Sequence, residues 1–285
     1  MFRWLMLQYR ARSELIKAFK SAGLYKRYKK LNGKDGIIYP EIHDVSFNKE
    51  KKYLRYTFSV LNGTDPAEVR KKAYCFQQHF GRNVELEGDL KNFTLTIHSK
   101  AMPAELPYKE KEIIEAVADY KLGIICGMDR YGQYVALDLL KQPHILIAGE
   151  TGSGKSTQLR SILTTLIRTK KPAELQLFLA DCKKSEFHLF RKVEHVQCVL
   201  SKPSDIAAML QRIKKELDER SDLTEKYEVG HIDEVPESQR RPYIVVCIDE
   251  FVMLRKDEAV MDILTEIVAI GRTLGVFAIL SMQRP

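Results

Sequence analysis

The stretch HILIAGETGSGKS, residues 144–156, decides the fold. A short apolar run leads into the pattern G-x-x-x-x-G-K-S and a helical pattern follows, which is the strand–loop–helix context of a phosphate-binding loop. Gly149, Gly152 and Gly154 let the backbone turn several N–H groups toward one anion. The following helix adds the partial positive charge of its N-terminus. The stretch therefore predicts a strand that ends at a phosphate site.

Two side chains that follow the last glycine of this loop are predicted to act on the phosphates. Lys155 has the reach to contact the β- and γ-phosphates, and the Ser156 hydroxyl is placed to ligate Mg²⁺. The predicted nucleotide-contacting residues form one continuous set: Gly149, Glu150, Thr151, Gly152, Ser153, Gly154, Lys155, Ser156 and Thr157. The alternative is a glycine-rich turn that opens a helix, with Lys155 as a solvated charge, and the flanking strand and helix disfavour it.

Composition indicates a globular protein of one large or two ordinary domains. The chain has 285 residues, of which 45% are hydrophobic and 29% are charged, as expected for a sizeable core. Its five cysteines are scattered without C-x-x-C spacing, so neither a disulfide framework nor a zinc site is indicated. We expect reduced thiols in a cytoplasmic protein. No apolar run reaches the roughly 18 residues that span a bilayer, and Arg10 and Arg12 interrupt the start too soon for a signal peptide.

The net charge of +8 is concentrated at the N-terminus. Residues 1–30 contain nine basic residues and one acidic residue, Glu14, which accounts for the whole excess. Apolar residues recur among them at spacings compatible with an amphipathic helix. One interpretation is that this helix contacts a partner, which would be an anionic membrane, secretion machinery or nucleic acid. The other is that its apolar face packs on the protein body, and both interpretations stay open. A peripheral position at the inner face of the cell membrane is the alternative to a purely cytoplasmic one.

Hydrophobic periodicity divides the chain into four segments. The predicted segments are a basic amphipathic helix (1–32), a small α+β domain (33–102), a linker helix with a β-hairpin (103–143) and an α/β domain that contains the phosphate loop (144–285). In the second segment we expect strands at 37–47, 52–61, 83–87 and 92–98, with a helix over 65–80. In the last segment strands alternate with helices, which predicts a mostly parallel sheet covered on both faces.

A second motif is YIVVCIDE, residues 243–250. A continuous apolar run is typical of a central parallel strand, and α/β sheets bind ligands at the carboxyl ends of their strands. We therefore expect Asp249 to hold Mg²⁺ through water and Glu250 to polarise the attacking water as general base. The alternative is a helix-capping aspartate followed by a solvated glutamate. A third run, GVFAILSMQRP (275–285), places Gln283 at the end of another buried strand, where a γ-phosphate or water contact is predicted.

These motifs together resemble a known family. QPHILIAGETGSGKS (142–156), Asp181-Cys-Lys183, Ile248-Asp-Glu250 and the ending Ser281-Met-Gln-Arg-Pro285 resemble the motor domain of the FtsK/SpoIIIE DNA translocases. Residues 128–138 resemble the β-hairpin that precedes the phosphate loop in that family, so the resemblance covers about 123–285. The short basic N-terminus and small α/β unit are most similar to the coupling ATPases of conjugative elements.

The resemblance implies a RecA-like P-loop NTPase core that binds ATP and Mg²⁺. It also implies a homo-oligomer, a hexameric ring, that moves double-stranded DNA, here in conjugative transfer. By resemblance Ser156 and Asp249 are linked to the metal, Glu250 is the catalytic base and Gln283 is the sensor. Arg272 matches a family arginine before the last strand. Asp181-Cys-Lys183 stands where the family usually has Asp-Pro-Lys, a difference that we expect to affect a turn.

The family core continues with a further strand, so we expect the core here to be incomplete and the chain to be C-terminally truncated. In the family that strand pairs with the strand at residues 144–148. Without it, we expect residues 144–148 to have an unpaired buried edge. Two other functions stay open: a nucleotide-binding fragment that neither hydrolyses nor translocates, and a chromosome-partitioning translocase. Other phosphate-loop enzymes are disfavoured: an ABC ATPase needs a Leu-Ser-Gly-Gly-Gln motif and a GTPase an Asn-Lys-x-Asp motif, both absent from this sequence, and a small-molecule kinase usually lacks the Asp-Glu pair.

Overall fold

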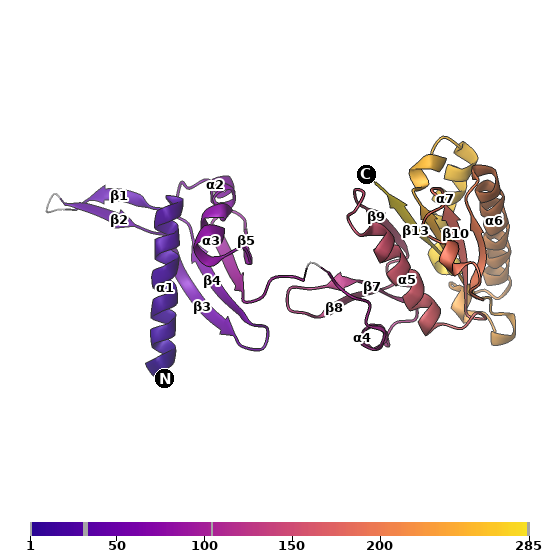
Figure 1. The fold of residues 1–285 in the computed structure, drawn as a ribbon, viewed down its shortest axis with the longest axis horizontal. Coiled ribbons are helices and arrows are strands. Elements are labelled where there is room, and N and C mark those ends of the chain that lie inside the picture. The colour runs from indigo at the N-terminus through magenta and orange to yellow at the C-terminus, as the bar shows by residue number, and fades with distance from the viewer. Residues whose placement is uncertain (1, 31–33, 104, 284–285) are drawn as a thin grey trace. The chain divides into compact units, whose positions relative to one another are not determined.

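The computed structural model describes residues 2–30, 34–103 and 105–283. The chain divides into two compact units, drawn in Figure 1. Unit 1 comprises Met1–Glu105 and Asp129–Gln133, and unit 2 comprises Leu106–Met128 and Tyr134–Pro285. No helix in the described ranges is long and apolar enough to cross a membrane.

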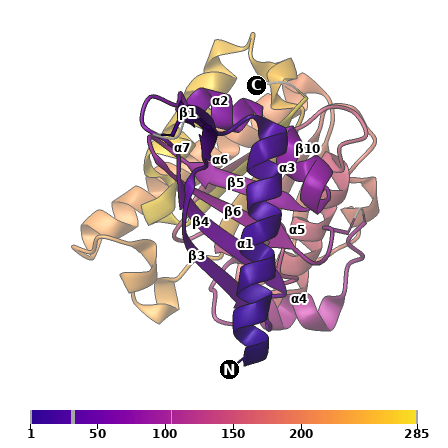
Figure 2. The ribbon, with the colours of Figure 1, turned by 90° about the vertical axis from the view of Figure 1, so that its left-hand side faces the viewer.

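Unit 1 is an antiparallel sheet crossed by a helix. Its helices are α1 (Phe2–Ala22), α2 (Pro66–Lys71) and α3 (Ala73–Phe80). Its strands are β1 (Lys26–Lys29), β2 (Asp35–Ile38), β3 (Glu41–Asn48), β4 (Tyr53–Ser59), β5 (Val84–Gly88) and β6 (Asn92–His98). The last four strands form one sheet in the order β3-β4-β6-β5, and α1 lies across it (Figure 2). Phe19 of α1 packs edge-on against Phe58 of β4 at a centroid distance of 4.9 Å, so the apolar face of α1 closes this core.

The predicted helix over residues 1–32 is wrong beyond Ala22, and residues 1, 31 and 32 of that range lie outside the described residues. The helix ends at Ala22 because Gly23 adopts φ = +67° and the Leu24 N–H bonds to the Phe19 carbonyl at 2.9 Å, which is a glycine cap. The basic residues that follow form β1, which pairs antiparallel with β2. The predicted strand over 37–47 is likewise divided, because Pro40 has no N–H to continue a ladder and separates β2 from β3.

Unit 2 is a parallel sheet between two helical layers. Its helices are α4 (Glu110–Ala116), α5 (Lys155–Thr169), α6 (Pro203–Lys226) and α7 (Glu258–Leu274). Its strands are β7 (Gly123–Met128), β8 (Tyr134–Asp138), β9 (His144–Ala148), β10 (Leu175–Asp181), β11 (Val196–Leu200), β12 (Tyr243–Asp249) and β13 (Val276–Met282). Short 3₁₀ turns span His188–Phe190, Ile232–Glu234, Glu237–Gln239 and Phe251–Leu254.

The five-stranded sheet has the order β11-β10-β12-β13-β9 and all its pairings are parallel, as predicted. Successive side chains of each strand alternate between the faces. On β12, Val245 and Cys247 join the cluster that α5 closes, whereas Val246 and Ile248 join the cluster of α6 and α7. Both faces are therefore apolar, which explains the continuous apolar runs of these strands.

The phosphate-loop strand β9 is the outermost strand of this sheet in the described residues. It pairs with β13, from His144 opposite Ala278 to Ala148 opposite Met282. Its other edge has no strand partner in the described ranges, and Leu146 of this strand is 54% exposed, so the strand is not deeply buried.

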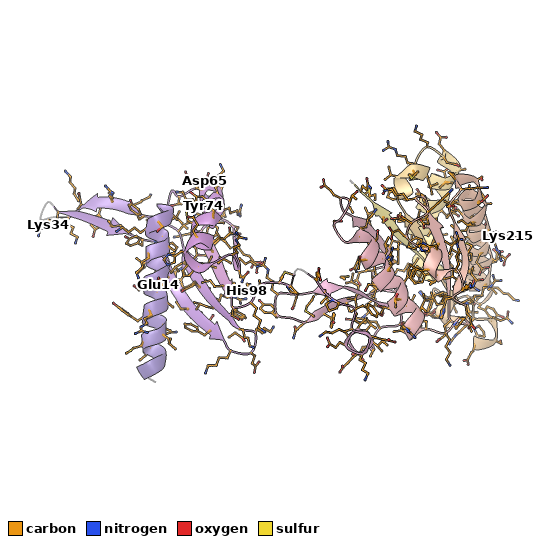
Figure 3. The ribbon with its side chains drawn as sticks, viewed as in Figure 1. Glu14, Lys34, Asp65, Tyr74, His98 and Lys215 are labelled. Carbon is orange, nitrogen blue, oxygen red and sulfur yellow. The ribbon has the colours of Figure 1, made fainter. Side chains whose placement is uncertain are left out.

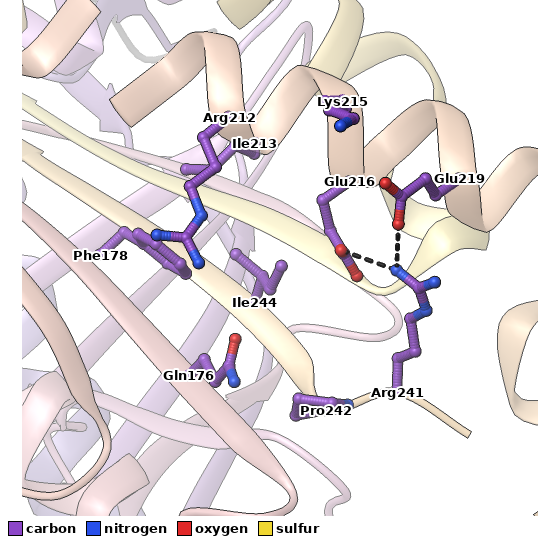
Figure 4. Close-up of a pocket in the computed structure, with 10 residues that line it drawn as sticks. All are labelled: Gln176, Phe178, Arg212, Ile213, Lys215, Glu216, Glu219, Arg241, Pro242 and Ile244. Carbon is purple, nitrogen blue, oxygen red and sulfur yellow. Dashed lines mark hydrogen bonds and ion pairs between the residues drawn. The ribbon is translucent and has the colours of Figure 1, made fainter. Parts of the chain in front are cut away.

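A charged network fixes α6 to the start of β12, at the opposite end of the sheet from the phosphate loop. Arg220 is fully buried, and its guanidinium donates to the carbonyls of Leu274 (2.9 Å) and Pro242 (2.6 Å) and to Glu216 (2.8 Å). Arg241 donates to the same Glu216 carboxylate at 2.7 Å (Figure 4). Arg220 therefore joins three segments of unit 2 through one side chain.

We expect Arg220→Met to destabilise unit 2 by about 3 kcal/mol, because two buried carbonyls lose their donor and Glu216 loses a buried partner. Urea unfolding followed by far-UV circular dichroism measures the loss, and hydrogen exchange of α6 and β12 assigns it to unit 2. Lys215→Met, at an exposed position of the same helix, is the matched control and should stay within about 0.5 kcal/mol of wild type. Equal stability of the two variants would contradict the role given to Arg220.

Candidate nucleotide site at the carboxyl edge of the sheet

The loop between β9 and α5 wraps a concave backbone toward the carboxyl edge of the sheet. Gly152 and Gly154 adopt φ of +84° and +91°, which side chains rarely tolerate. Gly149 lies against Ser153, since a Cβ at Gly149 would be 2.4 Å from the Ser153 hydroxyl oxygen. Gly154 precedes the first turn of α5 and has no side chain to cap it, so the amides of that turn are open to an anion.

Parallel pairing brings the ends of β12 and β13 to this loop. Ile248 of β12 lies opposite Leu280 of β13, and Met282 of β13 lies opposite Ala148 of β9. Asp249 and Gln283 follow directly and line one cavity of about 400 Å³ with the phosphate loop. The structure thus brings together residues that are more than 90 positions apart in the chain.

Two acidic residues at the end of β12 are held by one buried hydroxyl. Ser281 is fully buried; its Oγ donates to Asp249 Oδ1 at 2.5 Å and accepts the Glu250 N–H at 3.2 Å. Glu250 itself has φ = +58° and ψ = +51°, a left-handed conformation that costs a non-glycine residue on the order of 1 kcal/mol. The neighbouring contacts hold this strained residue with its carboxylate turned toward the loop.

The Glu250 carboxylate lies between two ammonium groups. Lys155 Nζ is 3.3 Å from Glu250 Oε2 and 3.4 Å from Asp249 Oδ1, and Lys183 Nζ is 2.7 Å from Glu250 Oε2. The other oxygen, Oε1, accepts the Gln283 N–H at 3.2 Å. Two lysines and two carboxylates therefore balance their charges at the mouth of the phosphate loop.

Lys183 is placed by the turn that follows β10. Asp181 is buried, and its carboxylate accepts the backbone N–H groups of Ser185 (3.1 Å), Glu186 (2.8 Å) and Phe187 (3.0 Å). These bonds fold the chain back after Asp181, so that Lys183, Ser185 and Glu186 line the cavity. Burial beside the carboxylates raises the pKa of the Cys182 thiol to about 11, so this thiol is neutral at physiological pH.

The electrostatics of the site keep Glu250 ionised. Burial raises the pKa of its carboxyl, but the hydrogen bond from Lys183, the Gln283 N–H and the nearby Lys155 outweigh burial and hold that pKa below its usual range. A general base has to be deprotonated before it can accept a proton. The arrangement meets that requirement.

The donor set of the cavity fits Mg²⁺ and a polyphosphate. The Ser156 hydroxyl and the Asp249 carboxylate both line it and offer the hard oxygen ligands that Mg²⁺ prefers. In the described ranges no three His, Cys, Asp or Glu side chains form a metal-binding group. A Mg²⁺ held here would therefore take its remaining ligands from phosphate and water, which is its usual mode.

Most of the predicted site residues converge on this cavity. It is lined by Gly149, Glu150, Thr151, Gly152, Gly154, Lys155, Ser156, Thr157, Asp249 and Gln283. Glu250 and Ser153 are not among the lining residues. The Glu250 carboxylate contacts the lining residue Lys155, and Ser153 lies against Gly149. Arg272 is not among the lining residues; it is exposed and its Nε donates to the Leu140 carbonyl at 3.2 Å.

Sequence reasoning missed Lys183 and Ser281 as site residues. Lys183 had one signal, the Asp181-Cys-Lys183 motif, but the motif does not show where the ammonium group goes. Ser281 had none, because a small polar residue in a buried strand is ordinary. The side-chain amide of Gln283 also donates to the Thr151 hydroxyl at 3.3 Å. The spacing of these two residues in the sequence does not predict this contact between the end of β13 and the phosphate loop.

A larger hollow of about 490 Å³ lies at the other end of the strands, beneath α6 (Figure 4). Its lining includes Gln176 and Ile244, near the starts of β10 and β12, and the pair of Arg241 with Glu216. It contains no phosphate-loop residue. Its charges serve the network around Arg220, so size does not identify the nucleotide site here.

We expect Lys183→Met to raise the pKa of the Glu250 carboxyl, because burial then acts against one compensating ammonium group instead of two. Titration of ¹³C-labelled glutamate side chains by NMR in the nucleotide-free chain measures it. The wild-type Glu250 signal should titrate below the usual glutamate range, and the variant signal should titrate at higher pH. Lys184→Met removes the same charge from the next, exposed residue and should leave the titration in place. A Glu250 pKa that does not move in Lys183→Met would contradict this account.

Comparison with known proteins shows which family part of this chain resembles. Residues 116–237 match the model of the FtsK/SpoIIIE family. The DNA translocase FtsK of Sporosarcina ureae is 34% identical over 181 residues, which cover 58% of this chain and 23% of the relative. That of Staphylococcus epidermidis is 31% identical over 192 residues, which cover 61% and 24%. The chain thus spans about a quarter of the length of the curated relatives that it matches.

Solved structures show the same fold. The pCW3 conjugation coupling protein TcpA, in a monomer form with ATPγS, aligns with a TM-score of 0.61 and 24% identity over 96% of this chain and 77% of its own. The cytoplasmic domain of the Type VII secretion ATPase EccC from Thermomonospora curvata aligns with a TM-score of 0.52 and 24% identity, over 60% and 23%. The fold prediction of an α/β P-loop core is confirmed, and the resemblance to the FtsK/SpoIIIE family is supported by the match of its model to residues 116–237.

Proposed function

We propose that this chain is an ATP-binding DNA translocase of the coupling type, which uses ATP hydrolysis to move double-stranded DNA in conjugative transfer. The observation that carries the proposal is the Glu250 carboxylate beside the phosphate loop, within 3.3 Å of Lys155 Nζ and 2.7 Å of Lys183 Nζ. A loop that only binds nucleotide has no need of an ionised carboxylate held in a strained conformation at its mouth. The comparisons support an ATPase at the level of the family.

In this proposal each residue has a defined task. The amides of the loop and Lys155 bind the phosphates, and Ser156 and Asp249 hold Mg²⁺, Asp249 through water. ATP with its Mg²⁺ supplies the electrophilic γ-phosphoryl group. Glu250 orients a water molecule and accepts its proton. The side-chain amide of Gln283 contacts the γ-phosphate or this water molecule.

The choice of conjugative transfer follows from the structural neighbour. The pCW3 conjugation coupling protein TcpA matches 96% of this chain, including unit 1, whereas the FtsK relatives match about 60%. Chromosome partitioning is therefore the second candidate. A homo-oligomeric ring, a hexamer, is part of the proposal, and Arg272, exposed at the end of α7, is its candidate for contact with a neighbouring subunit.

Association with a membrane or with secretion machinery through residues 1–30 remains a prediction. Its support is the first half of α1, along which Leu5, Leu7 and Tyr9 are 55%, 48% and 77% exposed. Apolar side chains gathered on one exposed stretch of a basic helix fit a surface that contacts something else.

We expect Lys155→Ala to abolish ATP binding and hydrolysis, because the phosphates lose their cation. Glu250→Gln should retain ATP binding but lose about 10²- to 10⁴-fold in turnover, which is the usual contribution of a general base. Steady-state ATP hydrolysis with and without duplex DNA, together with equilibrium ATP binding, separates the two effects. The exposed Lys184→Ala is the control and should retain activity.

The same measurements decide between the candidate functions. DNA-stimulated hydrolysis by the wild-type chain, lost in both site variants, supports the translocase. ATP binding without hydrolysis in a folded sample favours the nucleotide-binding fragment, and turnover that duplex DNA leaves unchanged argues against a DNA motor.

A further inference from the structure

A two-stranded ribbon in unit 1 gathers much of the positive charge of that unit. β1 pairs antiparallel with β2 from Lys26 opposite Ile38 onward, and beyond the pairing the Lys30 N–H bonds to the Lys34 carbonyl at 2.8 Å. Residues 26–38 contain five basic residues and one acidic residue. The ribbon projects from the helix and sheet of unit 1 (Figure 1), with Lys34 toward its outer part (Figure 3). All four residues of β1 are exposed.

Both faces of the ribbon are basic. Residues opposite one another in an antiparallel pair share a face, and successive residues alternate between faces. Lys26 and Tyr28 therefore share one face, and Arg27 and Lys29 share the other. The Tyr28 ring lies over Gly36, since a Cβ at Gly36 would be 2.5 Å from the ring. The glycine thus lets an aromatic ring lie flat across the ribbon.

The ribbon also exposes large apolar groups among its charges. Tyr28 and Ile37 are each 44% exposed and Ile38 is 47% exposed. A run of charge that serves only solvation has no need of such side chains. Basic groups next to apolar and aromatic ones fit nucleic acid, where the cations contact phosphates and the apolar groups contact sugars and base edges. The major groove of B-DNA, roughly 12 Å wide, admits a two-stranded β-ribbon.

The basic residues of α1 are engaged differently. Arg12 donates to the Ile42 carbonyl at 2.9 Å, and Lys17 pairs with Glu14 at 2.8 Å. These contacts use charges of α1 within unit 1 itself. One cation of the ribbon, Lys26, is engaged in the same way, since its ammonium group donates to the Asn62 carbonyl at 2.5 Å. The inference therefore rests on the other cations of the ribbon, the exposed Arg27, Lys29 and Lys30, and on the two-stranded form that carries them.

We propose that the β1–β2 ribbon is a contact surface for duplex DNA that works without nucleotide. The inference rests on the proposed function for its choice of duplex DNA. Its cations engage the phosphate backbone, so the contact does not depend on DNA sequence and weakens as salt rises. Such a contact would keep the chain on its substrate between cycles of ATP hydrolysis.

The test uses the full 285-residue chain, a fluorescent duplex and no nucleotide, with Kd measured at several salt concentrations. In the triple variant Arg27→Ala, Lys29→Ala, Lys30→Ala we expect an affinity loss of at least about tenfold. We also expect the slope of log K against log salt to fall by about 2 to 3, one counterion per lost phosphate contact. The control removes three exposed lysines elsewhere in unit 1, by Lys49→Ala, Lys91→Ala and Lys100→Ala, and should keep both the affinity and the slope.

Three results would overturn the inference: an unchanged slope in the ribbon variant, an equal loss in both triple variants, or no duplex binding by the wild-type chain. A parallel assay with phosphatidylserine vesicles covers a lipid surface. If the ribbon variant loses vesicle binding but keeps duplex binding, the ribbon belongs to a membrane contact and the inference is wrong. Circular dichroism checks that both variants are folded.

The outcome is independent of the proposed ATPase. Lys155→Ala should keep the duplex affinity of wild type, because the ribbon lies in unit 1 and the measurement contains no nucleotide. In one outcome the ribbon variant keeps DNA-stimulated ATP hydrolysis at saturating DNA, but its slope of log K against log salt is reduced. This outcome supports DNA contact by the ribbon and leaves the proposed motor activity intact. An unchanged slope together with DNA-stimulated hydrolysis rejects the ribbon alone.

Discussion

The parallel pairing of β13 with both β12 and β9 is the constraint on which the candidate site depends. Backbone hydrogen bonds fix Ser281 opposite Ile147 and Leu280 opposite Ile248, and this register decides which side chains meet at the edge of the sheet. A shift of one residue would turn Ser281 to the other face and leave both carboxylates without its hydroxyl. The chemistry of the loop is therefore set by a strand that is distant from it in sequence. The apolar clusters on both faces of the sheet stabilise that register.

Glu250 shows how the site balances strain against charge. Its left-handed backbone is unfavourable by itself, but it places the N–H on Ser281 and the carboxylate between Lys155 and Lys183. Lys155 is also the residue that the loop geometry assigns to phosphate. In the proposed function Lys155 turns to phosphate, and Lys183, whose Nζ lies 2.7 Å from Glu250 Oε2, is then the cation left to compensate the charge of Glu250. The second lysine therefore gives the base a partner that the phosphate loop does not need.

Local patterns in the sequence predicted the elements whose structure is decided locally. The phosphate loop, the apolar strands and the acidic pair after β12 each combine a residue pattern with a spacing, so their places in the sheet followed. The ribbon was missed because Lys26–Lys30 continues the basic pattern of the preceding helix, while one glycine, Gly23, ends that helix. Lys183 was missed because its position depends on three amides folding back onto Asp181, which is a tertiary contact and leaves no periodic signal.

The shorter helix changes how the charge of the N-terminus has to be interpreted. Four of the nine basic residues in 1–30 lie at 26–30, on β1 and directly after it, and the remaining five share the α1 segment with Glu14. As one helix, these charges would form a single surface with the apolar residues around Leu5 and Leu7. As a helix and a ribbon, they form two surfaces of different chemistry, one with its apolar face built into a core and the other exposed on both faces. An electrostatic partner is therefore expected at the ribbon, where both faces carry cations and the groups beside them can contact sugars and bases.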